Sequence, residues 1–487
     1  MKLLKDIIYK VRIEQVVGST NIAIEQLAFD SREVSAFSLF FAIKGTQVDG
    51  HEHIDNAVAN GAIAIICEEL PEEPQENITY VRVPDSAAAL GVVAANFHDH
   101  PSSKLKLIGV TGTNGKTSVT TMLFRLFRGM GHSCGLISTV EQRINDKVFA
   151  TKHTTPDPIR LNELMAQMVD ERIKYCFMEV SSHSVVQHRI TGLTFAGGVF
   201  TNITHDHLDY HGTFNNYIKA KKGFFDMLPD NAFALVNVDD NHSEVMVQNT
   251  KARKRSFGVK HMADHKCRII ENRLEGLYLN IDGHDVYTHL VGEFNASNIL
   301  AVYSVAVLLG GSPLEVLTEI SALEPVKGRF QIVKANDGVI GIVDYAHTPD
   351  ALKNVLGTIK DVRTGNEQLI TIIGCGGDRD KAKRPMMAKI AAEYSEQVVL
   401  TSDNPRSEDP QTIINEMKAG LDPSSSAKSY SVVDRKEAIN MAANLAGPGD
   451  VILLAGKGHE DYQEIKGERF PFDDVKVLQE TFELLHS

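Results

Sequence analysis

The sequence predicts a three-domain α/β protein, and three observations support this fold class. The chain has 487 residues, whereas a single hydrophobic core rarely grows beyond about 250–300 residues. Apolar runs of strand length alternate with helical patterns, which is typical of mostly parallel sheets. Polar, proline-containing breaks at residues 98–103 and 324–330 separate three blocks of this pattern. We therefore expect domains over residues 1–100, 101–327 and 328–487.

The first block is expected to contain three strands and two helices. Its strand-length apolar runs cover residues 39–43, 62–67 and 80–83. A short helix is expected over residues 54–60, because Gly61 can adopt the left-handed conformation that often ends a helix. A second, alanine-rich helix is expected to run to Phe97, with Asp85 or Ser86 as its N-terminal cap.

The second block is expected to form a central parallel sheet. It opens with a strand over residues 105–110 and a helix that runs to about residue 128. Two further buried strands are expected over residues 175–180 and 198–200. A helix that carries two asparagines is expected over residues 292–309.

In the third block, each apolar strand runs directly into a polar loop. The strands are expected over residues 340–343, 369–373, 398–400 and 451–454. Open α/β sheets bind their ligands at the carboxyl ends of the strands. We therefore expect a C-terminal Rossmann-like domain with a binding crevice formed by these loops.

The composition is that of an ordinary globular protein. Apolar residues are 43% and charged residues 23% of the chain, which excludes wholesale disorder. The net charge of −13 argues against a general nucleic-acid or anionic-membrane binder. Five cysteines without a CxxC pair predict a reducing compartment and no structural zinc site. Because a signal-peptide core and a long apolar run are both absent, we expect a cytoplasmic protein without a membrane span.

The stretch Gly-Thr-Asn-Gly-Lys-Thr at residues 112–117 is a candidate phosphate loop, because it lies between an expected strand and an expected helix. Lys116 would reach the terminal phosphates, and the Thr117 hydroxyl would bind Mg²⁺. The loop is shorter than the common form, which would place its first glycine at Val110. A glycine turn with a surface lysine is the alternative, which the surrounding strand and helix disfavour. By itself the loop fits a kinase, a motor, a GTPase or a ligase.

A cluster of carboxylates and histidines follows the next two strands. Glu179 ends a buried strand, where it could bind Mg²⁺ beside the phosphate loop. Residues 205–212 contain three histidines and two aspartates, but no cysteine or HExxH spacing accompanies them, so zinc is weakly supported. Lys219, Lys221 and Lys222 lie on an expected helix. Taken alone they predict a solvated cationic face, and their spacing does not distinguish one from another.

Together these motifs resemble the Mur ligase family, ATP-dependent amide-bond ligases of bacterial cell-wall precursor synthesis. The resemblance covers essentially the whole chain and is specific in order and spacing. The motifs that carry it are residues 112–117, 179–183, 201–204 with 206–212, 292–295 with Asn298, 328–330 and 344–347.

Within the family, the chain is most similar to members that add the third amino acid of the stem peptide. The resemblance implies that meso-diaminopimelate is joined to the D-glutamate γ-carboxylate of UDP-N-acetylmuramoyl-L-alanyl-D-glutamate through an acyl phosphate, with ATP as co-substrate. The discriminating loop is Asp-Asn-Pro-Arg at residues 403–406. Arg406 offers a planar fork to the second carboxylate of meso-diaminopimelate. Lysine lacks that carboxylate, so such a site disfavours it.

The resemblance also implies the residues of each binding site. ATP is expected at Gly112, Thr113, Asn114, Gly115, Lys116, Thr117, Ser118, Asn298, Arg329 and Asp344. The UDP-muramoyl-dipeptide is expected at Ser31, Thr46, Gln47, Val48, His153, Thr154, Thr155, Ser181, Gln187 and Arg189. Some relatives carry asparagine where this chain has His153. Diaminopimelate is expected at Arg379, Asp403, Asn404, Pro405, Arg406, Gly456 and Glu460.

The catalytic set implied by the resemblance is Lys116, Glu179, His207 and Lys221. Thr117 and Glu179 would bind one Mg²⁺, and a second ion is expected near His207 and Lys221. Lys221 matches a family lysine that CO₂ carbamylates, which turns a cation into an anion with two oxygens. A monomer is expected from the resemblance. Closure of the third block over the substrates is expected as well, because an acyl phosphate must be kept from water.

Other functions remain open at this stage. The L-lysine-adding members and the folate-polyglutamylating ligases share the chemistry, but the first block and the loop at residues 403–406 argue against the latter. A P-loop kinase or motor would turn over ATP without an amino acid. A non-catalytic nucleotide-binding module is disfavoured because Lys116, Thr117 and the acidic-histidine cluster are all present.

Overall fold

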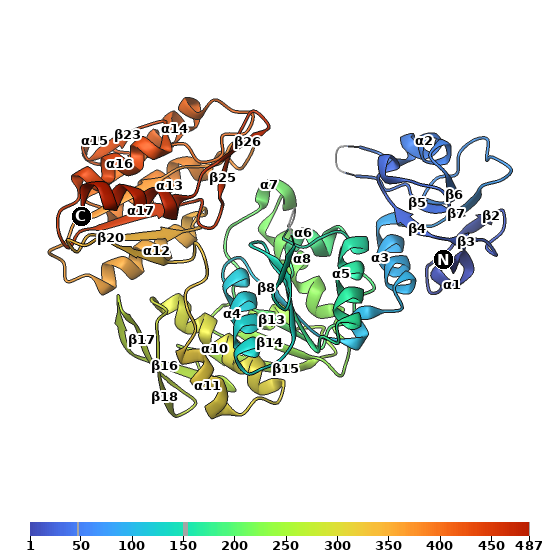
Figure 1. The fold of residues 1–487 in the computed structure, drawn as a ribbon, viewed down its shortest axis with the longest axis horizontal. Coiled ribbons are helices and arrows are strands. Elements are labelled where there is room, and N and C mark those ends of the chain that lie inside the picture. The colour runs from blue at the N-terminus through green and yellow to red at the C-terminus, as the bar shows by residue number, and fades with distance from the viewer. Residues whose placement is uncertain (46–47, 150–153, 487) are drawn as a thin grey trace.

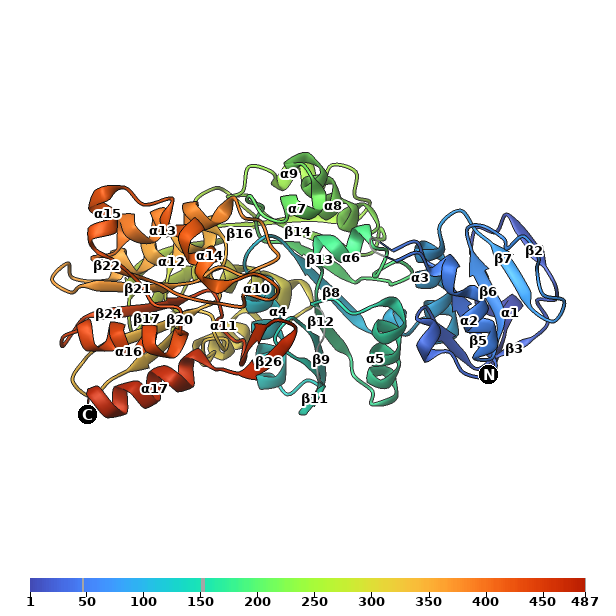
Figure 2. The same ribbon diagram turned by 90° about the horizontal axis from the view of Figure 1, so that it is seen from above.

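The computed structural model describes residues 1–45, 48–149 and 154–486. Three sheet-based domains follow one another along the chain. Figure 1 shows the N-terminal and C-terminal domains at opposite ends of the central domain, and Figure 2 shows the same order from above. The predicted three-domain α/β class is confirmed, while the domain limits at residues 100 and 327 stay predictions.

The N-terminal domain is built on a five-stranded sheet in the order β2-β7-β6-β5-β4. Only β2 is antiparallel to its neighbour. Asp85 Oδ1 accepts from Ala88 N at 2.8 Å, so Asp85 rather than Ser86 is the cap of α3. The elements are β1 (Lys2–Leu3), α1 (Leu4–Ile7), β2 (Gln15–Val17), β3 (Ala23–Ile24), β4 (Gln26–Ala28), β5 (Ser38–Phe41), α2 (Ile54–Ala59), β6 (Ala62–Cys67), β7 (Thr79–Arg82) and α3 (Ser86–Phe97).

The central sheet has the order β11-β10-β9-β12-β8-β13-β14-β15-β16-β17-β18. Its strands from β9 to β16 are parallel, and hairpins make both edges antiparallel. The strands are β8 (Lys106–Thr111), β9 (Cys134–Ile137), β10 (Gln142–Ile144), β11 (Lys147–Phe149), β12 (Tyr175–Glu179), β13 (Gly197–Phe200), β14 (Phe233–Asn237), β15 (Arg253–Gly258), β16 (His265–Arg273), β17 (Gly276–Ile281) and β18 (His284–Thr288).

Helices cover both faces of this sheet, because successive side chains of a strand point to opposite faces. Ile108 and Val110 pack with α4 and α10, whereas Leu107 packs with α5 and α8 on the other face. Because β8 lies in the interior of the sheet, the loop that follows its carboxyl end is flanked by the ends of neighbouring strands on both sides. The helices are α4 (Lys116–Gly129), α5 (Pro158–Asp170), α6 (Ser182–Val186), α7 (Leu208–His211), α8 (Phe214–Asp226), α9 (Ser243–Met246), α10 (Glu293–Leu308) and α11 (Pro313–Ser321).

The C-terminal sheet has the order β19-β20-β24-β21-β22-β23, with only β19 antiparallel. The strands are β19 (Gln331–Lys334), β20 (Ile340–Asp344), β21 (Leu369–Ile373), β22 (Gln397–Leu400), β23 (Ser429–Ser431) and β24 (Val451–Ala455), with a separate hairpin of β25 (Tyr462–Ile465) and β26 (Glu468–Pro471). The helices are α12 (Pro349–Val362), α13 (Lys383–Tyr394), α14 (Pro410–Lys418), α15 (Pro423–Ala427), α16 (Arg435–Leu445) and α17 (Asp474–Leu485). Within the described residues, no helix combines the length and apolarity needed to cross a membrane.

A fully buried ion pair joins α16 to α17. The guanidinium of Arg435 binds the carboxylate of Asp474 in a bidentate fashion, with Nε–Oδ1 and Nη2–Oδ2 distances of 2.7 and 2.6 Å. Both side chains are 0% exposed. Removing one partner of such a pair leaves an uncompensated charge in the protein interior, which is strongly unfavourable.

Replacing Asp474 by alanine is therefore expected to lower the free energy of unfolding of the C-terminal domain by about 3–5 kcal/mol. Urea unfolding followed by far-ultraviolet circular dichroism measures this loss. Glu483 is exposed on the same helix, so Glu483→Ala is the control and should change stability by less than about 0.5 kcal/mol. An equally small change for Asp474→Ala would contradict the prediction.

Candidate active site

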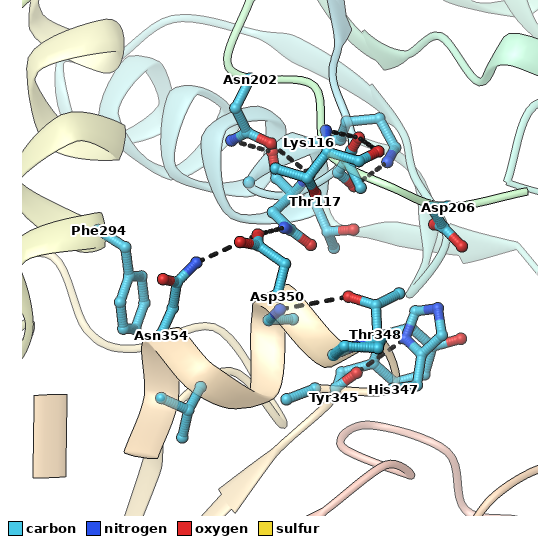
Figure 3. Close-up of a pocket in the computed structure, with 18 of the residues that line it drawn as sticks. Lys116, Thr117, Asn202, Asp206, Phe294, Tyr345, His347, Thr348, Asp350 and Asn354 are labelled. Atoms are coloured by element: carbon cyan, nitrogen blue, oxygen red, sulfur yellow. Dashed lines mark hydrogen bonds between the residues drawn. The ribbon is translucent and has the colours of Figure 1, made fainter. Parts of the chain in front are cut away.

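A cavity of about 1050 Å³ lies between the central and C-terminal domains. Its walls include the loop after β8, the loop after β13 and the first turn of α12. Figure 3 shows Lys116 and Thr117 on one side of this cavity, facing Thr348 and Asp350 on the other. The cavity thus opens at the carboxyl ends of strands in both sheets, as the polar loops predicted.

The phosphate loop requires its two glycines. A Cβ at Gly112 would collide with Thr201 Oγ1. Gly115 has a φ of +85°, and a Cβ there would lie 2.5 Å from Asn298 Oδ1. Gly115 is also the residue before α4, so Lys116 and Thr117 lie in the first turn of this helix. The positive end of the helix dipole favours an anion at this position.

Lys116 folds back over the loop that carries it. Its Nζ donates to the carbonyl oxygens of Gly112 and Thr113 at 3.0 and 2.9 Å. Burial lowers the pKa of the Lys116 amine. The ammonium therefore faces a group of loop carbonyls beside the site where phosphates would bind, and a phosphate would be a more favourable partner than these carbonyls.

Lys221 is buried in α8, with only 1% of it exposed. Its Nζ donates to the carbonyl of Gly112 at 2.7 Å and lies 4.6 Å from the centre of the Tyr217 ring. Within the part of the chain that the structure describes, Lys221 forms no salt bridge. Burial and the nearby charge of Lys116 hold the pKa of Lys221 well below its usual range.

The prediction that the three lysines form a solvated cationic face is therefore wrong for Lys221. Lys219 is exposed, and Lys222 pairs with Asp226 at 2.7 Å. Residues one and two positions apart on a helix point in different directions, so only one of the three lysines turns towards the phosphate loop.

Glu179 and the histidine cluster lie on the same side of the cavity. Glu179 is fully buried, and its carboxylate accepts from Thr139 N at 2.7 Å and from Thr139 Oγ1 at 3.1 Å. His207 has its Nε2 at 3.4 Å from Asp206 Oδ2. Burial lowers the pKa of His207 to about 3 and that of His183 to about 4. Among the described residues, no group of three or more His, Cys, Asp or Glu side chains is arranged to bind a metal ion.

Oxygen atoms nevertheless suit Mg²⁺ at this site. The hydroxyl of Thr117 and the carboxylate of Glu179 both line the cavity, and Mg²⁺ prefers such hard oxygen ligands. The Thr139 contacts fix the orientation of the Glu179 carboxylate, as second-layer hydrogen bonds do in metal sites. The chemistry of these two residues therefore fits the cation.

Two contacts connect the C-terminal domain to the phosphate loop. Asn114 Nδ2 donates to Asp350 Oδ2 at 3.1 Å, and Arg329 Nη2 donates to Thr117 Oγ1 at 3.2 Å. The Arg329 guanidinium also lies 4.4 Å from the centre of the Tyr345 ring. Nearby, Asp344 accepts from Phe330 N at 2.7 Å, and burial raises the pKa of its carboxyl group.

Most of the expected ATP residues line the cavity, but Gly112 does not. Of the residues expected to bind the UDP-muramoyl-dipeptide, four line it: Thr154, Thr155, Ser181 and Arg189. Gln187 accepts from Arg189 Nη2 at 2.6 Å, so it contacts a lining residue. Ser31, which starts the short turn Ser31–Glu33, and Val48 do not line this cavity. Thr46, Gln47 and His153 lie outside the described residues.

The residues expected to bind diaminopimelate gather at the C-terminal wall of the cavity. Arg379, Asp403, Asn404, Arg406, Gly456 and Glu460 all line it, whereas Pro405 does not. Arg406 Nη1 donates to the carbonyl of Gly377 at 2.7 Å, and its Nε lies 3.8 Å from Glu464 Oε2. Asn404 Nδ2 donates to Glu460 Oε2 at 2.7 Å. The wall therefore presents both cations and anions.

Several polar residues of the cavity were not predicted from the sequence, and two of them connect separate segments of the site. Asp350 lies in the first turn of α12 and accepts from Asn114 across the domain interface. Lys383, at the start of α13, donates to the carbonyl of His347 at 3.0 Å. Both follow polar loops at strand ends, and this was the one signal that could have identified them.

Comparison with known proteins identifies the family of the chain. Residues 23–98 match the Mur ligase family, catalytic domain; residues 110–306 match the Mur ligase middle domain; residues 328–458 match the Mur ligase, glutamate ligase domain. The chain is 54% identical to the UDP-N-acetylmuramoyl-L-alanyl-D-glutamate–2,6-diaminopimelate ligase of Cytophaga hutchinsonii, over 99% of both chains.

Solved structures show the same fold. A UDP-N-acetylmuramoyl-L-alanyl-D-glutamate–2,6-diaminopimelate ligase superimposes with a TM-score of 0.71 at 30% identity, over 100% of this chain and 99% of that one. The folylpolyglutamate synthase of Mycobacterium tuberculosis, solved with ADP and AMPPCP, superimposes with a TM-score of 0.63 at 16% identity. That similarity covers 76% of this chain and 93% of the synthase. From its matched domains and its full-length relatives, the chain belongs to the Mur ligase family of amide-bond-forming enzymes.

Proposed function

We propose that this enzyme joins meso-diaminopimelate to the D-glutamate γ-carboxylate of UDP-N-acetylmuramoyl-L-alanyl-D-glutamate, with conversion of ATP to ADP and phosphate. The observation that carries the proposal is the cavity wall where Arg406, Asp403 and Glu460 meet, across from the phosphate loop. Full-length relatives named for the same reaction support it. The product would be a precursor of peptidoglycan, so the enzyme would serve cell-wall synthesis, cell shape and division. We expect it to act in the cytoplasm as a monomer.

The reaction would proceed in two steps. The γ-carboxylate oxygen attacks the γ-phosphorus of ATP, and the bond to the bridging oxygen breaks, which releases ADP and leaves an acyl phosphate. The amine nitrogen of diaminopimelate, once it has lost a proton, then attacks the acyl carbon and phosphate leaves. Lys116 would stabilise the negative charge on the phosphoryl oxygens. Enclosure between two domains would protect the acyl phosphate from water.

A divalent cation completes the phosphate site in this proposal. Thr117 and Glu179 would bind Mg²⁺, which supplies positive charge to the phosphate oxygens when it is bound. Thr117 Oγ1 now accepts from Arg329. The Arg329 guanidinium therefore lies beside the residue that would hold the cation, where it would supply a further positive charge to the phosphates.

Lys221 would act as a carbamate. Only a neutral amine attacks CO₂, and the buried Lys221, which forms no salt bridge with any described residue, has a pKa well below its usual range. The carbamate is an anion with two oxygens, so it could attract a cation near His207, whereas the protonated ammonium form of Lys221 would repel one. As an anion it would also remove the repulsion between Lys221 and Lys116.

The wall around Arg406 would select the amino acid. Meso-diaminopimelate carries a carboxylate and an ammonium group at the end that does not react. Arg406 could pair with that carboxylate through two parallel hydrogen bonds, and the carboxylates of Asp403 and Glu460 could accept from the ammonium group. L-Lysine has no second carboxylate, so it would leave the Arg406 guanidinium without its partner.

Phosphate release from ATP tests the function directly. The reaction would contain UDP-N-acetylmuramoyl-L-alanyl-D-glutamate with meso-diaminopimelate, with L-lysine, or with no amino acid. Release with meso-diaminopimelate alone is the expected result. Release with L-lysine would identify a lysine-adding Mur ligase, and equal release in all three reactions would indicate a kinase or another NTPase.

Replacing Arg406 by methionine is expected to lower kcat/KM for meso-diaminopimelate by about a hundredfold, which corresponds to about 3 kcal/mol. The preference for meso-diaminopimelate over L-lysine should fall as well. The control is Arg363→Met, because Arg363 pairs with Glu396 at 2.7 Å and does not line the cavity. If Arg406→Met kept the original preference, Arg406 would not be the selecting residue.

A further inference from the structure

A buried lysine, Lys457, lies behind the loop that carries Arg406. Its side chain is 0% exposed, and it does not line the cavity. We propose that Lys457 is a positioning residue for the incoming amino acid, because it fixes Asp403, Asn404 and Glu460 in the arrangement that receives the far end of the substrate. This inference rests on the proposed function and adds to it the residue that sets the geometry of the amino-acid site.

Lys457 contacts each of these three residues. Its Nζ donates to Asn404 Oδ1 at 3.3 Å, and lies 3.6 Å from Asp403 Oδ1 and 3.5 Å from Glu460 Oε2. It also donates to the carbonyl of Tyr462 at 2.5 Å. A buried ammonium group is costly unless it is paired and hydrogen-bonded. These contacts therefore determine where the two carboxylates can lie around the lysine.

Lys457 also sets the orientation of the Asn404 amide. Asn404 Oδ1 accepts from both Lys457 Nζ and Glu464 N, the latter at 2.9 Å. The amide nitrogen must then point the other way, where it donates to Glu460 Oε2 at 2.7 Å. A flipped amide would place its NH₂ group against the ammonium of Lys457, which is unfavourable because both are donors.

The same lysine connects the loop to the hairpin of β25 and β26. Arg406 N donates to the carbonyl of Glu464 at 3.0 Å, and Lys466 N donates to the carbonyl of Arg406 at 2.6 Å. Arg406 has a φ of +51°, a conformation that costs energy for a residue other than glycine. The hairpin contacts stabilise this conformation, and Lys457 holds the start of the hairpin through Tyr462.

Charge gives Lys457 a second effect on the site. Asp403 Oδ1 has no hydrogen-bond partner among the described residues, and burial, together with the nearby charge of Asp403, raises the pKa of Glu460. Without Lys457, less positive charge would offset the repulsion between the carboxylates of Asp403 and Glu460. One of the two would then favour its neutral form. A protonated carboxyl group would bind the substrate's ammonium group less tightly.

Steady-state kinetics of the full-length enzyme tests the proposal. We would compare wild type, Lys457→Met and Lys457→Gln, and vary meso-diaminopimelate at saturating ATP and UDP-muramoyl-dipeptide. Lys457→Met is expected to raise KM for meso-diaminopimelate by about tenfold or more, and to lower kcat by no more than about threefold. KM for ATP should not change. Lys457→Gln can still donate to Asn404 and Tyr462, so its KM should fall between those of wild type and Lys457→Met.

Lys428→Met is the matched control. Lys428 is a half-buried lysine of the same domain that donates to the carbonyls of Ala392 and Ser395 at 2.6 and 2.7 Å, away from the cavity. This control should lose stability but keep the KM for meso-diaminopimelate. An unchanged KM in folded Lys457→Met would overturn the proposal, as would failure of both Lys457 variants to fold, which would assign the lysine a purely structural role. A wild-type enzyme whose phosphate release does not depend on meso-diaminopimelate would instead overturn the proposed function.

Discussion

Replacing Lys116 by methionine should lower kcat by about a thousandfold, the largest effect that we expect from a single substitution. In the structure the Lys116 ammonium group contacts two loop carbonyls. In the reaction it would contact the phosphoryl group, on which negative charge is redistributed in the transition state. Methionine has a similar length but no charge, so it would remove the electrostatic stabilisation and keep most of the packing.

Phosphate release at saturating substrates measures this loss. The control is Lys222→Met, which removes a lysine that pairs with Asp226 and does not line the cavity. The control should retain at least about half of the wild-type kcat, as is typical of substitutions away from a site. A Lys116→Met enzyme with nearly normal kcat would exclude the phosphate-binding role of this loop.

Replacing Lys221 by methionine should lower kcat by about a hundredfold or more, and it should not destabilise the protein. These two effects differ because the unmodified Lys221 is a buried amine without an anionic partner in the described structure. Its removal relieves the cost of burying a charged group next to Lys116. Thermal unfolding of Lys221→Met should therefore occur at the wild-type temperature or above it.

Dependence on CO₂ distinguishes carbamylation from a simple role of the amine. Wild-type activity should fall in solutions depleted of CO₂ and recover when bicarbonate is added, whereas Lys221→Met should respond to neither treatment. Lys219→Met, on the exposed face of the same helix, is the control and should respond like wild type. Wild-type activity that is insensitive to CO₂ would mean that Lys221 acts without carbamylation.

Local patterns predicted most of the elements that position the site. The strands at residues 62–67 and 369–373 agree with β6 and β21, and the helix expected to end near residue 128 agrees with α4. These segments have strong local signals, such as uninterrupted apolar runs or a glycine next to a helix. Residues 253–288 gave no such signal, because charged residues are frequent there, and they form β15 to β18 at the edge of the central sheet.

The α/β class, the candidate phosphate loop and the family could be recognised from the sequence, since each depends on the order of residues along the chain. Which side chains contact one another could not be predicted from the sequence. Burial distinguished Lys221 from Lys219 and Lys222, because burial depends on the helix face that packs against the sheet. Asp350 contacts Asn114 across a domain interface, and Lys457, which follows the end of β24, contacts Asn404 in the loop after β22. Contacts between residues so far apart in sequence follow from packing, which leaves no local pattern in the chain.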